Sequence, residues 1–326
     1  MSRIVYISWP AREITGGVKS AFHHVDALRR AGFDAVVASN DTTPPGWFDT
    51  PLDILPLAEI ARGDDILVMP ENHHGFLERF ADWPNRKVVL CLNHFYAHRG
   101  LGRRAGYGDY GVAELIVPGI APAAFCRERF PDLNVTIVPP FIDPEVFAPG
   151  GRKRLAISFV PRKRKFEAMF INDLFRARYA GDREVRWVEL SNAREAEVAK
   201  TFADTAVHLS LCSFEATPMT PLEAMASGCI VAGFAGFGGN EYATDMNGFW
   251  AAEDDVIECA RQLGRAVDLA ARGGALYDDM IEAGTATARR YGRERFETRL
   301  IAFWSAMLDG SGVGGAADAK VTGTDA

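Results

Sequence analysis

Short apolar strands alternate with amphipathic helices along the first half of the chain. The clearest helix is predicted over residues 17–31, where Val18, Phe22 and Val25 recur at helical spacing and Gly32 ends the element. Apolar strands separated by helices indicate a parallel sheet that is covered on both faces. The predicted strands of this sheet are short and rich in β-branched residues: 4–8, 35–39, 66–69, 88–92, 115–117 and 135–138.

A second α/β series follows the first. Strands are predicted at residues 155–160, 186–190, 207–211 and 229–234, and helices at 165–179, 193–203, 255–271, 275–290 and 293–308. Two series predict two domains, over residues 1–149 and 150–290. The stretch 309–326 has no apolar period and is rich in Gly, Ala and Asp, which predicts a disordered tail.

Composition excludes several classes of protein. A length of 326 residues favours two domains, and hydrophobic and charged contents of 48% and 24% are typical of a soluble globular protein. The net charge of −7 argues against a general nucleic-acid binder. Five cysteines without Cys-x-x-Cys spacing fit reduced thiols, and no signal peptide or membrane-spanning run is evident. We therefore expect a cytoplasmic protein.

Two carboxylates bracket a turn-rich segment and are the most informative residues of the chain. Glu215 is followed by Ala-Thr-Pro-Met-Thr-Pro-Leu, and Glu223 then opens a short apolar helix that stops at Gly228. Burying such a carboxylate is costly unless donors satisfy it, so a residue of this kind usually binds something polar. With its Leu-Glu-Ala-Met-Ala-Ser-Gly continuation, the segment resembles the Glu-x7-Glu signature of the retaining GT-B glycosyltransferases of the family-four type.

The segment between the two domains carries the same resemblance. Pro139, Asp143, Phe147 and Pro149 match the family's Pro-x-x-x-Asp-x-x-x-Phe-x-Pro interdomain run. The resemblance implies a GT-B fold, in which two doubly wound Rossmann-like domains face each other across a cleft. It also implies that the final helix, residues 291–308, crosses back onto the first domain.

Roles for individual residues follow from this resemblance. It implies that Glu215 holds a hydroxyl of the donor sugar near the reacting carbon, and that Glu223 holds the ribose hydroxyls of the nucleotide. Where the family has a Gly-Phe-Gly-Leu/Met-Pro run, Ala216 and Pro218 replace the two glycines. Since proline cannot donate a backbone hydrogen bond, the donor-binding amides are expected to be those of Met219 and Thr220.

A basic run begins directly after the first strand of the second domain. Its cations stand where a helix opens, which adds the positive end of the helix dipole. The resemblance implies an arginine and a lysine on the donor diphosphate, and Arg162 and Lys165 are the candidates. Lys163 is the alternative for the lysine, and a solvated basic run is the alternative for the whole segment.

The first domain offers weaker candidates. Gly17 belongs to a Thr-Gly-Gly turn that opens the first long helix, where the family has a similar loop near the acceptor and the diphosphate. His94 follows a predicted strand at the position of a family histidine that faces the active site, and a structural role is its alternative. His94 and His98 lack the adjacent glutamate of a zinc motif, so no metal site is predicted.

The resemblance thus implies a metal-independent, retaining hexosyltransferase that needs no cofactor. Its partners would be a nucleotide diphosphate sugar and a hydroxyl acceptor on a glycan, a glycolipid or a small molecule, with peripheral membrane contact left open. Two alternatives remain: a GT-B nucleotide-sugar epimerase, and a catalytically inactive GT-B scaffold in an envelope-polysaccharide assembly complex. Donor base, donor sugar, acceptor and oligomeric state do not follow from the sequence.

Overall fold

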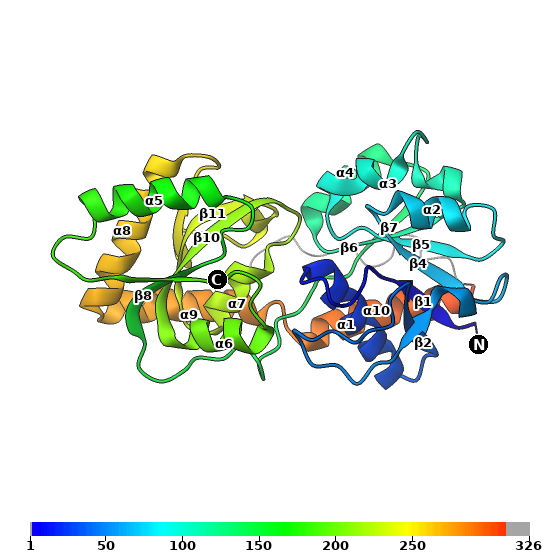
Figure 1. Cartoon of the computed structure of the whole chain (residues 1–326), viewed down its shortest axis with the longest axis horizontal. Coiled ribbons are helices and arrows are strands. Elements are labelled where there is room, and N and C mark those ends of the chain that lie inside the picture. The colour runs from blue at the N-terminus through cyan, green and yellow to red at the C-terminus, as the bar shows by residue number, and fades with distance from the viewer. Residues whose placement is uncertain (1, 311–326) are drawn as a thin grey trace.

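The computed structural model describes residues 2–310 and consists of two lobes, each built on a parallel β-sheet (Figure 1). The first sheet has the order β3-β2-β1-β4-β5-β6-β7, and the second has the order β12-β11-β10-β8-β9. The strands of the first sheet are β1 Ile4–Ile7, β2 Ala35–Ser39, β3 Ile54–Pro56, β4 Ile66–Pro70, β5 Lys87–Leu90, β6 Glu114–Val117 and β7 Asn134–Ile137. The strands of the second sheet are β8 Arg154–Phe159, β9 Arg186–Glu189, β10 Thr205–Glu215, β11 Ile230–Phe237 and β12 Gly248–Ala251.

Helices cover both faces of each sheet. Beneath the first sheet α1 and α10 share one apolar core, and α2, α3 and α4 share the core on its other face. In the second lobe α5 and α8 cover one face, while α6 and α7 cover the other. The helices are α1 Gly16–Arg30, α2 His74–Phe80, α3 Ala97–Leu101, α4 Ile120–Arg129, α5 Lys165–Arg178, α6 Glu195–Asp204, α7 Met219–Ala226, α8 Val256–Arg272, α9 Ala275–Arg289 and α10 Arg293–Leu308.

The strand order of each sheet reverses once, and these reversals determine where ligands can bind. In the first sheet the chain builds outward from β1 to β3 and then returns to place β4 on the other side of β1. In the second sheet the reversal lies between β8 and β10. Ligands of doubly wound sheets bind beyond the carboxyl ends of the strands at such a switch point.

The predicted architecture of two doubly wound α/β domains is confirmed. Several short elements were not predicted: the strands β3 and β12 and the helices α2, α3 and α4. Strand β10 is also longer than the predicted 207–211, because it continues through Glu215. From residue 311 onward, the predicted disordered tail lies outside the described residues.

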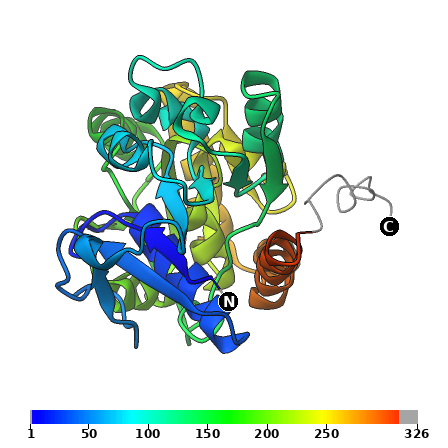
Figure 2. The ribbon, with the colours of Figure 1, turned by 90° about the vertical axis from the view of Figure 1, so that its right-hand side faces the viewer.

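Helix α10 packs on the first lobe although it follows the whole second lobe in sequence (Figure 2). Its side chains Phe296, Leu300 and Trp304 are buried in the core that α1 forms with the first sheet. The Trp304 Nε1–H donates to the hydroxyl of Tyr6 on β1 at 3.1 Å. That hydroxyl also lies 3.0 Å from Nδ1 of the buried His24 on α1, so a polar chain runs through this core.

The two segments that connect the lobes are bonded to each other. Arg293, the first residue of α10, pairs with Asp143 of the linker at 2.6 Å, and its guanidinium lies 4.5 Å from the ring centroid of Phe141. The backbone N–H of Ile142 donates to the carbonyl of Tyr291 at 2.9 Å. Motion of one lobe relative to the other must therefore involve both connections together.

We expect truncation after Arg290 to expose the apolar surface on which α10 packs and to destabilise the first lobe. The smaller change Leu300→Ala should lower the free energy of unfolding by about 2–5 kcal/mol, as for other buried leucines. Thermal unfolding and size-exclusion chromatography measure both effects. A protein truncated after Gly310, which keeps α10, is the matched control. A protein ending at Arg290 that stays monomeric with an unchanged unfolding midpoint would show that α10 is dispensable.

Candidate functional site

Loops at the carboxyl ends of the two sheets meet between the lobes. The side-chain amide of Asn93, after β5, donates to the carbonyl of Phe214 on β10 at 2.8 Å. At the start of α4, the backbone N–H of Ala121 donates to the carboxylate of Glu241 at 2.6 Å. The predicted site residues lie on these loops and on the helices that follow them.

Glu215 and Glu223 lie on either side of the short connection between β10 and α7, residues 216–218. Glu215 is the last residue of β10, and its carboxylate pairs with Lys163 Nζ at 2.6 Å. Glu223 lies on α7 and is half-buried; its backbone carbonyl accepts from Ser227, whereas its carboxylate accepts no hydrogen bond from residues 2–310. Burial raises the pKa of Glu223, and the positive charge of Lys19 opposes that rise. Glu223 is therefore available to bind hydroxyls of a ligand.

The basic run after β8 divides into buried and exposed cations. Arg162 and Lys165, the predicted phosphate ligands, have exposed side chains, and Lys165 is the first residue of α5. Lys163 instead points to Glu215, and it also donates to the carbonyl of Ser213 at 2.8 Å. The structure thus brings Lys163, the alternative lysine, directly to Glu215.

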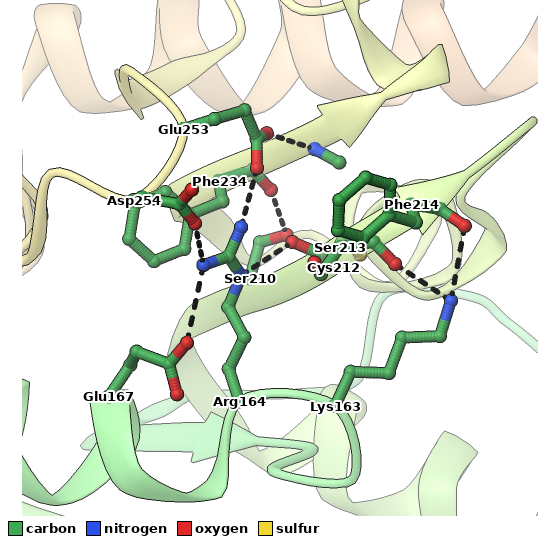
Figure 3. A network of polar contacts seen from close by, with 11 residues as sticks. Lys163, Arg164, Glu167, Ser210, Cys212, Ser213, Phe214, Phe234, Glu253 and Asp254 are labelled. Atoms are coloured by element: carbon green, nitrogen blue, oxygen red, sulfur yellow. Dashed lines mark hydrogen bonds and ion pairs between the residues drawn. The ribbon is translucent and has the colours of Figure 1, made fainter.

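Arg164 is a structural cation that the sequence analysis did not single out. Its side chain is only 2% exposed, and its guanidinium pairs with Glu253 and with Asp254, both at 2.6 Å. It also donates to the carbonyl of Cys212 at 3.0 Å and lies 4.3 Å from the ring centroid of Phe234 (Figure 3). Arg164 therefore joins the carboxyl ends of β8, β10, β11 and β12.

Lys19 faces the second lobe from the first turn of α1. It pairs with Glu195 at the start of α6, and its charge acts on Glu223. Burial lowers the pKa of Lys19, and the carboxylates of Glu223 and Asp143 oppose that shift. A cation is unfavourable at a helix N-terminus because of the helix dipole. A lysine two residues after Gly17 was therefore a sequence signal for a functional position, and the sequence analysis missed it.

Gly17 lies at the N-terminus of α1, where the hydroxyl of Thr15 accepts from the N–H of Val18 at 3.4 Å. A Cβ at Gly17 would meet only Leu92, at an ordinary contact distance of 3.8 Å. Internal packing therefore does not require a glycine here. The open surface at this turn leaves room for a ligand close to the backbone.

His94 and Thr217 each bury a polar atom that has no partner within residues 2–310. The atoms are Nδ1 of His94, in the short 3-10 helix after β5, and Oγ1 of Thr217, between the two glutamates. Burial lowers the pKa of His94, so its ring is neutral at pH 7. Such orphaned groups cost free energy unless a ligand or a water satisfies them. Both lie on loops at the interface between the lobes.

The N-terminus of α7 presents the amides of Met219 and Thr220. Pro218 is the cap residue, and no side-chain hydrogen bond caps the helix. The Pro218 carbonyl accepts from the hydroxyl of Tyr242 at 2.8 Å, which holds the turn in place. Because Pro221 has no N–H, the Met219 and Thr220 amides are the donors that this first turn offers to an anion or a hydroxyl.

Two kinds of feature are absent from the described part of the chain. Within residues 2–310, no three or more His, Cys, Asp or Glu side chains gather in an arrangement that could hold a metal ion. Over the same residues, none of the helices combines the length and the apolar character needed to cross a membrane.

Comparison with known proteins identifies the kind of domain that carries this site. Residues 181–287 match the family described as Glycosyl transferases group 1. An alpha-1,6-glucosyltransferase of Actinobacillus pleuropneumoniae serotype 7 (strain AP76) is 28% identical over 280 residues, which cover 81% of this chain and 83% of that protein.

Solved structures show the same architecture. HepE of Anabaena, solved in complex with UDP, superposes with a TM-score of 0.70 at 11% identity and covers 93% of this chain and 100% of HepE. Sucrose-phosphate synthase of Thermosynechococcus elongatus gives a TM-score of 0.66 at 13% identity, covering 95% of this chain and 100% of that one. The chain therefore carries a group 1 glycosyltransferase domain within a GT-B fold, and it is an enzyme of the hexosyltransferase type.

Proposed function

We propose that the protein is a retaining, metal-independent glycosyltransferase that moves a hexose from a nucleotide diphosphate sugar to an acceptor hydroxyl. The observations that carry the proposal are the Lys163–Glu215 pair, at 2.6 Å, and the half-buried carboxylate of Glu223, which accepts no hydrogen bond within residues 2–310 and feels the charge of Lys19. One cation from the loop after β8 and two carboxylates from the end of β10 and from α7 match what a diphosphate and the hydroxyls of a sugar and a ribose require.

In the proposed reaction the bond between the anomeric carbon and the diphosphate oxygen breaks. The acceptor oxygen attacks the anomeric carbon from the same face, and its proton passes to the departing phosphate oxygen. Positive charge develops on the sugar and negative charge on the diphosphate. Lys163, Arg162, Lys165 and the N-termini of α5 and α7 would stabilise that negative charge without a metal ion, and no cofactor takes part.

UDP-glucose is the donor that we propose to test first. The relative from Actinobacillus is a glucosyltransferase, and HepE has been solved with UDP-glucose. We propose a glycan, glycolipid or small-molecule acceptor rather than a nucleic acid, because the chain has a net charge of −7. Five free thiols favour a reducing, cytoplasmic location.

Turnover of UDP-glucose with hexoside acceptors should continue in EDTA, because the proposed charge stabilisation comes from side chains and helix N-termini. The product should carry the α-configuration of the donor, which the coupling constant of its anomeric proton reports in NMR. A β-linked product, or activity that EDTA abolishes and manganese restores, contradicts the proposal. Epimerised nucleotide sugar in the same spectra indicates the epimerase, and UDP binding without any turnover indicates the inactive scaffold.

Glu223→Ala should weaken the binding of UDP by about 1–3 kcal/mol, the range for hydrogen bonds to a charged group. Isothermal titration calorimetry measures this change. The matched control is Glu282→Ala, which removes an exposed glutamate on α9 and should leave UDP affinity unchanged. Equal affinities for the Glu223→Ala protein and the wild type, with both folded, would remove Glu223 from the nucleotide site.

Peripheral membrane contact is the last part of the proposal, and α5 is the surface suited to it. Phe166, Met169 and Phe170 form a stripe on α5 and are 75%, 63% and 65% exposed. The exposed Lys165 and Arg176 lie four residues before and seven residues after Met169, which places them on the same side of the helix. Exposed apolar side chains beside cations complement the surface of an anionic bilayer.

The triple variant Phe166→Ser, Met169→Ser, Phe170→Ser should lose sedimentation with vesicles that contain phosphatidylglycerol. The wild type should sediment with these vesicles and stay in solution with pure phosphatidylcholine. Leu276→Ser is the matched control, because Leu276 is 64% exposed on α9 and lies outside the stripe. Absence of sedimentation by the wild type rules out membrane contact, and a wild-type dimer that the triple variant converts to a monomer assigns the stripe to a second copy of the chain.

A further inference from the structure

Two phenylalanines at the ends of adjacent strands hold a backbone conformation that bulky residues rarely adopt. Phe214 near the end of β10 has φ 48°, and Phe237 at the end of β11 has φ 69°. Positive φ values of this kind are unfavourable for bulky side chains and persist only when surrounding contacts impose them. Strain of this kind concentrates at active sites and ligand-binding loops.

Contacts from both lobes impose the strained backbone at Phe214. Its carbonyl accepts from Asn93 Nδ2 at 2.8 Å. It also accepts from Lys163 Nζ at 3.4 Å (Figure 3). Asn93 is itself held by the buried carboxylate of Glu71, which accepts from its backbone N–H at 3.1 Å. The conformation is therefore built from residues at the carboxyl ends of β4, β5, β8 and β10.

The backbone on both sides of Phe237 is constrained, as it is at Phe214. The N–H of Gly236 donates to Glu253 at 2.6 Å, and Glu253 is the partner of the buried Arg164. A Cβ at Gly238 would lie 1.9 Å from the carbonyl oxygen of Ala216, so the two loops are in direct contact. Phe237 is thus fixed between two constrained glycines.

The strained conformation keeps the two rings out of the core. Phe214 is 52% exposed and Phe237 is 40% exposed, whereas Phe234, also on β11, is fully buried. The centroids of the two exposed rings lie 5.2 Å apart. The ring of Phe95, from the first lobe, lies 5.3 Å from Phe214 and 5.7 Å from Phe237. We call these three rings the phenylalanine platform.

The platform lies beside the proposed reaction centre. Phe214 directly precedes Glu215, and Phe237 pairs with Glu215 in the register of β10 and β11. The rings carry no charge, so they do not suit the diphosphate, for which Lys163 is the neighbouring cation. They suit the apolar face of the second substrate.

We propose that the phenylalanine platform is an acceptor subsite and that the acceptor presents a sugar ring to it. The inference rests on the proposed glycosyltransferase function. The C–H groups on one face of a pyranose carry partial positive charge and pack on the negative face of an aromatic ring. The sugar's hydroxyls meet the polar groups around the platform.

Those polar groups distinguish a sugar from other acceptors. Nδ1 of His94 is buried without a partner among the described residues, and the His94 ring centroid lies 4.1 Å from that of Phe95. An acyl chain on the platform would leave this nitrogen unsatisfied, and a small polyol such as glycerol has no extended apolar face. A sugar ring supplies both the apolar face and the hydroxyls.

Saturation-transfer difference NMR with methyl α-D-glucoside in the presence of UDP tests the subsite without turnover. The wild type should transfer saturation from aromatic protons to the C–H protons of the glucoside, and should transfer little to glycerol. Phe214→Leu and Phe237→Leu remove a ring but keep an apolar side chain of similar size, and each should abolish most of the transfer. Leu276→Ala, an exposed apolar change on α9, should leave it intact.

Kinetics with UDP-glucose provide a second readout. Each leucine variant should raise KM for the glucoside about fivefold to tenfold, the effect expected from losing one aromatic stacking contact. Hydrolysis of UDP-glucose without acceptor, and the affinity for UDP, should stay at the wild-type level. A wild type that hydrolyses UDP-glucose but shows no saturation transfer to the glucoside overturns the subsite and leaves the proposed function standing.

A leucine variant with an unchanged KM for the glucoside also overturns the subsite. So does a variant that loses UDP affinity and glucoside affinity together, because the rings would then act in holding the two lobes in place. If the wild type itself does not hydrolyse UDP-glucose, that result would instead contradict the proposed function. Thermal unfolding of both leucine variants should first verify that each is folded, so that the saturation-transfer and kinetic results can be interpreted.

Discussion

The buried guanidinium of Arg164 is the constraint on which the rest of the site depends. An arginine that is 2% exposed is tolerable only because Glu253 and Asp254 neutralise it and the Cys212 carbonyl accepts one of its N–H groups. These partners come from the ends of different strands, so one side chain holds their loops in register. Removing it would leave the carboxylate of Glu253, which is 20% exposed, without its cation, and this costs more than losing the pair with Asp254, which is 82% exposed.

The geometry of the reaction centre follows from that anchor. Because Arg164 is fixed, its neighbour Lys163 is directed to Glu215 and to the carbonyls of Ser213 and Phe214. Glu253 extends the same network to the loop after β11 through the N–H of Gly236. A buried cation thus positions a half-buried one, and preorganised charge of this kind is what stabilises a departing phosphate.

The departure from the family pattern between the two glutamates has a structural counterpart. Ala216 is nearly fully buried, and its carbonyl lies so close to Gly238 that any side chain at position 238 would overlap it. The backbones at Ala216 and Gly238 therefore approach each other closely. The glycine that permits this lies in the loop after β11 and not between the two glutamates. Pro218 in turn holds the entry to α7 through its hydrogen bond from Tyr242, which leaves the Met219 and Thr220 amides as donors.

Periodicity along the sequence determined the two α/β series, the long helices α1, α5, α8, α9 and α10, and the place of the glutamate pair, because each is a local pattern of side chains. It could not determine the shortest elements, such as β3 and α3, since three to five residues carry too little pattern. Only the tertiary structure decided that Lys163 meets Glu215, while Arg162 and Lys165 remain exposed. The tertiary structure alone also brought the charge of Lys19 to Glu223 and imposed positive φ on Phe214. The reason is that these contacts join residues far apart in the chain, and their energies depend on burial and on partners from other elements.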